Sequence, residues 1–155
     1  MRVLKKILIG LGSVFLVLVA LFTWLGIQSV RFKHEEAPFV KAYLTDLSRR
    51  WSVADVYNRS ANTFVEQADS AKGQRTIESF RPLGALISIQ GFSLKNYSDG
   101  TWGQRGVFDF KARFQNGEAL VEVTILEKGH TGPRVLGIYL TGIHVNPGAS
   151  GKMTT

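Results

Sequence analysis

The side chains best suited to metal binding or proton transfer in this sequence are its three histidines. His34, His130 and His144 lie far apart, so none has the i,i+4 or H-x-H spacing that brings two imidazoles to one metal ion. The chain contains no cysteine, which excludes thiol nucleophiles, Cys-ligated zinc, iron–sulfur clusters and disulfides. We therefore expect no metal site and no cofactor.

Sequence motifs for catalysis are also missing. The chain has no nucleophile elbow, phosphate-binding loop or dinucleotide-binding fingerprint. Residues 127–130 bring an acid, a lysine and a histidine together, but a charged hairpin turn containing Gly129 explains this stretch more simply. The sequence thus favours a protein that is not an enzyme.

Charge is distributed unevenly along the 155 residues, whose formal net charge is +7. Residues 7–30 contain no charged side chain, and all twelve acidic residues follow them. Basic residues after position 30 are spread among acidic ones, so nucleic acid is not an expected partner. The composition allows one ordinary domain and excludes collagen-like, disordered and disulfide-stapled proteins.

The apolar segment predicts a membrane anchor. Its 21 residues from Ile7 to Ile27 would span about 32 Å as a helix, close to the thickness of a bilayer's hydrocarbon core. Residues 22–28 offer no small-residue cleavage pattern, so we expect an uncleaved signal anchor in contact with membrane lipid, with Trp24 at the outer interface. The basic residues before the span outweigh those after it, which places the N-terminus in the cytoplasm. Those preceding basic residues are Arg2, Lys5 and Lys6.

This layout predicts a cytoplasmic tail at 1–6, a transmembrane helix at 7–30, an extracytoplasmic α+β domain at 31–145 and a flexible tail at 146–155. After Glu35, apolar residues recur at spacings of three and four and indicate an amphipathic helix of about four turns. The apolar stripe consists of Val40, Tyr43, Leu44, Leu47 and Trp51.

Further helices are expected before position 84. Ser52 and Asp55 have the spacing of a capping box, which predicts a second helix with Val53, Val56 and Tyr57 facing inward. A short third helix would carry the apolar residues of 77–83 and end at Pro82 and Gly84.

Beyond Gly84 the hydrophobic period becomes two. Strands are expected at 85–97, 104–114, 118–127 and 134–145, with an Asn-Gly hairpin at 116–117. The fold class is therefore α+β, with two or three helices packed on a four-stranded antiparallel sheet behind the anchor.

The order of elements carries a resemblance to a known superfamily. The expected elements are, in order, a long first helix, a capped second helix, a short third one, the Phe-x-Phe-x-Ala-x-Phe strand at 108–114, the Asn-Gly hairpin and a closing strand at 135–145. This order resembles the cystatin-like cone of nuclear transport factor 2-like domains. That superfamily includes enzymes, ligand binders and dimeric scaffolds. In its enzymes an Asp or His base works with a Tyr or Asp donor, so Tyr57 could be a donor, but no base can be placed opposite it. An anchor ahead of such a domain is also similar to the inner-membrane assembly subunit of type IV secretion machines.

The last strand is apolar on both faces. Regular alternation puts Val135, Tyr139 and Ile143 on one face, opposite Leu136, Ile138 and Leu140. One face can be covered by the helices, and the other must meet another protein or a curved part of the same sheet. Trp102, in a glycine-rich turn, is a second candidate contact unless it packs back onto its own sheet.

Three functions fit these features. The first is a non-enzymatic subunit in a bacterial-type inner membrane, whose periplasmic or extracellular domain stabilises a complex through Trp102, Val135, Tyr139 and Ile143. Its partners would be other membrane subunits or a second copy of the chain. The alternatives are an extracytoplasmic module that binds a small apolar ligand or lipid, and an anchored enzyme.

Overall fold

The computed structural model describes the backbone of residues 2–128 and 131–146, and the side chains of residues 16–24, 26, 27, 29–128 and 131–146. The chain divides into two compact units, Met1–His34 and Glu35–Thr155. Of the regions expected from the sequence, residues 147–155 of the C-terminal tail lie outside the described residues, as does His130.

In the first unit, the described residues all belong to one long helix. Helix α1 covers Arg2–Arg50, and its N-terminal half is long and apolar enough to cross a membrane. The described apolar side chains of this half are exposed, for example Leu16, Phe22 and Ile27. A surface of this kind is what a helix in contact with lipid presents.

The segment expected as anchor and the amphipathic segment after Glu35 both belong to α1. Residues 31–37 include several good helix formers and no glycine or proline. Pro38 lies inside the helix, where it removes one backbone donor without ending it. In the second unit, α1 buries the predicted stripe of Val40, Tyr43, Leu44 and Leu47.

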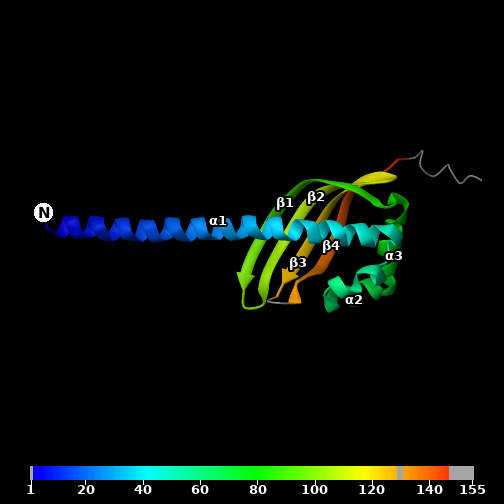
Figure 1. Cartoon of the computed structure of the whole chain (residues 1–155), viewed down its shortest axis with the longest axis horizontal. Helices are drawn as coiled ribbons and strands as arrows, with labels where there is room; N and C mark the ends of the chain where they lie inside the picture. Colours follow the sequence, from blue (N-terminus) through cyan, green and yellow to red (C-terminus); the bar gives the residue numbers. More distant parts are fainter. Residues whose placement is uncertain (1, 129–130, 147–155) are drawn as a thin grey trace, which may run out of the picture. The chain divides into compact units, whose positions relative to one another are not determined.

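The sheet agrees closely with the expected strands. Strands β1 (Leu86–Gly100), β2 (Gly103–Phe114), β3 (Gly117–Glu127) and β4 (Pro133–Val145) form an antiparallel meander in chain order (Figure 1). Their inner face supplies about half of the buried apolar residues that the structure describes, and the Ser48 hydroxyl of α1 accepts the backbone N–H of Leu86 at 2.9 Å. The buried inner residues are Phe108, Phe110, Ala112, Phe114, Ala119, Val121, Val123, Ile125 and Val135. The fold is α+β, as predicted.

The helices between α1 and the sheet differ from the prediction. A 3-10 helix at Val53–Arg59 replaces the expected second α-helix, and α2 (Asn62–Asp69) and α3 (Ala71–Ser79) follow. No capping box forms, because the Ser52 side chain makes no cap bond and the Asp55 carboxylate instead accepts from the Arg50 guanidinium at 3.0 Å. A second 3-10 helix, Arg81–Leu83, leads to Gly84.

Candidate functional site: a cavity between helices and sheet

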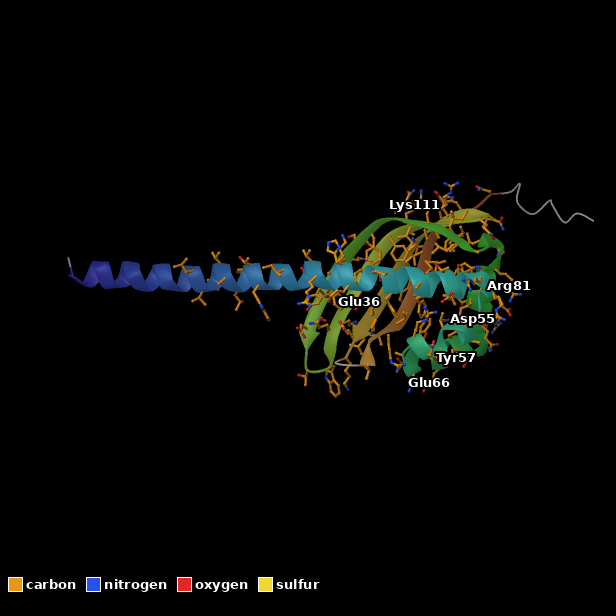
Figure 2. The ribbon with its side chains drawn as sticks, in the orientation of Figure 1. Glu36, Asp55, Tyr57, Glu66, Arg81 and Lys111 are labelled. Atoms are coloured by element: carbon orange, nitrogen blue, oxygen red, sulfur yellow. The ribbon has the colours of Figure 1, made fainter. Side chains whose placement is uncertain are left out.

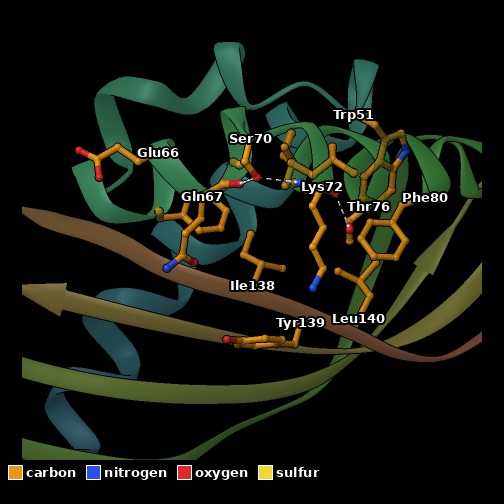
Figure 3. Close-up of a pocket in the computed structure, with 15 residues that line it drawn as sticks. Trp51, Glu66, Gln67, Ser70, Lys72, Thr76, Phe80, Ile138, Tyr139 and Leu140 are labelled. Atoms are coloured by element: carbon orange, nitrogen blue, oxygen red, sulfur yellow. Dashed lines mark hydrogen bonds between the residues drawn. The ribbon is translucent and has the colours of Figure 1, made fainter.

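The second unit contains an apolar cavity of about 680 Å³ (Figure 3). We call it the helix–sheet cavity, because its walls come from the end of α1, from α2 and α3, and from β4. Its volume lies within the usual range for small-molecule sites. The apolar lining residues are Leu47, Trp51, Phe64, Ala68, Ile77, Phe80, Ile138 and Leu140.

One face of helix α3 forms a wall of the cavity. Gly73, Thr76, Ile77 and Phe80 follow the i, i+3, i+4, i+7 spacing of one helix face, and all four line the cavity. The helix starts at Ser70, whose hydroxyl oxygen accepts the backbone N–H of Gly73 at 3.0 Å. The third helix expected at 77–83 overlaps only the end of α3, because the residues at 69–75 are polar; the spacing of Gly73, Ile77 and Phe80 was a usable signal for the earlier start.

The hairpin of α2 and α3 depends on Gly73. A Cβ at this position would lie 2.1 Å from the Gln67 carbonyl oxygen and 2.7 Å from the Ala68 Cα. Because atoms cannot approach so closely, a side chain at this position would push the two helices apart. The small residue therefore sets the distance between two cavity walls.

Trp51 holds the corner of the cavity where α1 ends. Its backbone φ is 51°, in the left-handed region that glycine usually occupies after a helix. The side chain is only 3% exposed, its indole N–H donates to the Gly84 carbonyl at 3.1 Å, and its ring lies 5.7 Å from the ring of Phe80 and 5.5 Å from that of Phe114. Burial and these contacts stabilise the unfavourable backbone conformation.

Irregular pairing in β4 decides which of its side chains reach the cavity. Ile138 and Leu140 pair with the buried Val123 and Val121 of β3 and line the cavity. The register shifts between Thr124 and Ile125, so Val135 opposes the buried Ile125 on this same inner face. A bulge of this kind adds one residue to a strand and interrupts its alternation.

The expected interaction face of β4 is therefore not formed as predicted. Val135 is fully buried in the core of the unit. Tyr139 is 65% exposed and pairs with Glu122, whose face of the sheet is the outer one, although Tyr139 also contributes to the cavity's rim. Ile143 follows a second irregularity at Gly142, where φ is 55°, and is 40% exposed.

The other predicted residues lie elsewhere. Trp102 is exposed in the turn between β1 and β2, with the Lys128 ammonium 5.7 Å from its ring centre, and does not pack onto its own sheet. Tyr57, expected to face inward, instead lies at the surface of the domain (Figure 2); it is 40% exposed, and its hydroxyl donates a hydrogen bond to Asp69. Among the residues that the structure describes, no group of three potential metal ligands is present.

Lys72 is the positively charged group of the helix–sheet cavity. Figure 3 shows its side chain reaching from α3 across the cavity toward β4. Glu66, the acidic lining residue, turns its carboxylate away from the cavity in the same view. Among the residues that the structure describes, the cavity lining thus combines an apolar surface with one ammonium group, and none of its side chains directs a general base at the centre.

A second unusual group lies outside the cavity. Glu36 of α1 is 4% exposed, and its Oε2 has no hydrogen-bond partner among the described residues. Burial, with the nearby charges of Glu127 and Glu35, raises the pKa of this carboxyl from 4.5 to about 7.

No protein-family model matches the chain, and no curated protein sequence matches it.

Proposed function

We propose that this protein is a single-pass membrane protein whose domain at 31–145 binds a small apolar ligand or lipid. The observation that carries the proposal is the helix–sheet cavity, about 680 Å³ in volume and lined mainly by apolar side chains. Apolar cavities with a few polar groups are the usual form of small-molecule sites. None of the described lining residues points a general base at the centre of the cavity, which favours binding over catalysis.

We also propose a nuclear transport factor 2-like domain and an extracytoplasmic location. The helices followed by a four-stranded antiparallel meander support the first. The basic residues before the apolar segment support a cytoplasmic N-terminus in a bacterial-type inner membrane. A ligand-binding domain at this place would have membrane lipid as its nearest source of apolar molecules.

Photolabelling of the full chain in phosphatidylcholine nanodiscs tests the binding proposal. The probe is a long-chain alcohol with a diazirine in its tail, and peptide mapping locates the labelled residues. We expect label in the apolar segment at 7–30, from bilayer contact, and additional label in α3 and β4. Label confined to 7–30 would refute the proposal.

A matched pair of variants makes the test specific. Thr76 lines the cavity, so Thr76→Trp should fill it and lower the labelling of β4. Its neighbour Arg75 lies on the same helix but not in the lining, so Arg75→Trp should leave that labelling unchanged. Equal loss in both variants would show that the label in β4 does not report on the cavity.

Assembly of a membrane complex is a second proposed function, favoured by the outer face of the sheet. Tyr139 is 65% exposed there and Leu120 is 55% exposed. The two residues lie on neighbouring strands, and β4 is an edge strand of the sheet. A partner subunit or a second copy would cover these side chains, with Trp102 and Ile143 as further contacts.

A further inference from the structure

We infer that the ligand of the helix–sheet cavity is a long-chain carboxylate whose head group binds Lys72. The inference rests on the proposed binding function and adds the chemical class of the ligand. It starts from the combination of one ammonium group with a surface that is otherwise largely apolar.

Lys72 has no ion-pair partner among the residues that the structure describes. Its side chain is exposed toward the cavity, and the carboxylate of Glu66 points away (Figure 3). A positive charge at an apolar site favours an anionic ligand group, which can accept charge-assisted hydrogen bonds from the ammonium.

The serine and threonine hydroxyl groups of the lining already make hydrogen bonds within the hairpin of α2 and α3. Ser70 donates to the Gln67 carbonyl at 2.6 Å and accepts from the Gly73 N–H at 3.0 Å. Thr76 donates to the carbonyl of Lys72 at 2.9 Å. Of the polar side chains that are left, the Gln67 amide and the Tyr139 hydroxyl are neutral, so the Lys72 ammonium is the group that would select an anionic ligand.

The number of charges favours a carboxylate over a phosphate. A carboxylate carries one negative charge, which the single lysine neutralises. Sites for phosphate groups generally add arginine or several backbone N–H groups, and the described residues that line this cavity include no arginine. The aromatic and aliphatic walls, including Trp51, Phe80 and Ile138, match a hydrocarbon tail.

The experiment compares two photoreactive probes of equal chain length, a fatty acid and the corresponding fatty alcohol, on the full chain in phosphatidylcholine nanodiscs at pH 8. Label in the apolar segment at 7–30 measures bilayer contact and normalises each probe. We expect the acid to label α3 and β4 about threefold to tenfold more than the alcohol does, as a partly exposed charge pair allows.

Two variants locate the effect. Lys72→Met should abolish the preference for the acid while keeping alcohol labelling, because the aliphatic part of the side chain is retained. Arg75→Met removes one positive charge from the same helix outside the cavity lining and should keep the preference.

Each remaining outcome has a distinct meaning. Equal labelling by acid and alcohol would overturn the carboxylate inference and leave the binding function intact. A Lys72→Met variant that loses both labels equally would also overturn it, because the lysine would then support the cavity and not the head group. No label in α3 or β4 from either probe would overturn the binding function itself.

Discussion

At the scale of single residues, Glu36 makes stability depend on pH. Its pKa of about 7 in the folded protein lies above the ordinary 4.5, so folding disfavours the ionised form. Below pH 4.5 the carboxyl is neutral in both states and no penalty applies. The unfolded chain loses its proton first as the pH rises, so stability falls between pH 4.5 and 7 and the penalty is complete above 7.

The substitution Glu36→Gln should remove this penalty. We expect the variant to be more stable than the natural chain by up to about 3 kcal/mol at pH 8 and nearly equal at pH 4. Denaturant unfolding of the full chain between pH 4 and 8 measures the difference. Glu66→Gln, at an exposed position, is the control and should change stability little at any pH. If the free energy of unfolding changed with pH in the same way in the natural chain and in Glu36→Gln, Glu36 would not be the source of the pH dependence.

Tyr139 tests the assembly function at the same scale. Because this side chain is 65% exposed, Tyr139→Glu should change the free energy of unfolding by less than about 0.5 kcal/mol. If another chain covers Tyr139, the new charge should strongly weaken association, since it would be buried without a partner. Chemical cross-linking in membranes measures association, and thermal melting measures folding. A variant that melts normally and cross-links as before would exclude Tyr139 from an interface.

At the scale of elements, a substitution of Gly73 distinguishes the effect of helix propensity on stability from the effect of packing. Alanine usually stabilises a helix interior by about 1 kcal/mol relative to glycine. In α3 we expect the opposite sign, with Gly73→Ala destabilising the domain by about 1 to 3 kcal/mol, because the added Cβ would meet the backbone of α2. Thermal melting measures the sign. Gln74→Ala, at an exposed position in α3, is the control for helix propensity. A second glycine such as Gly91 is unsuitable as a control, because its φ of 66° would add backbone strain to the substitution.

The sheet was predictable from sequence because its signals are local. The alternation at 108–114 and the Asn-Gly pair at 116–117 were enough to place β2 and β3 within a residue of their observed ends. The short helices were harder, since α2 and α3 together cover only a few turns and are largely polar. Their positions depend on contacts with each other and with β4, which local propensity does not encode.

At the scale of the whole molecule, topology is the main prediction. A reporter that is active only outside the cytoplasm should be active when fused after Thr155, because basic residues precede the apolar segment. The same reporter fused directly after Lys6, without the apolar segment, should be inactive. Activity of a cytoplasm-only reporter at Thr155 would show that the orientation is the reverse of the predicted one.

The sequence by itself determined the long apolar helix, the α+β class and the four strands, because each follows from a hydrophobic period within one segment. The tertiary structure alone decided the helix–sheet cavity, since Trp51, Lys72 and Ile138 come from segments far apart in the chain. It also decided the two faces of β4. Alternation holds only while a strand pairs regularly, and the irregular pairing with β3 moved Val135 into the core and left Tyr139 on the outer face.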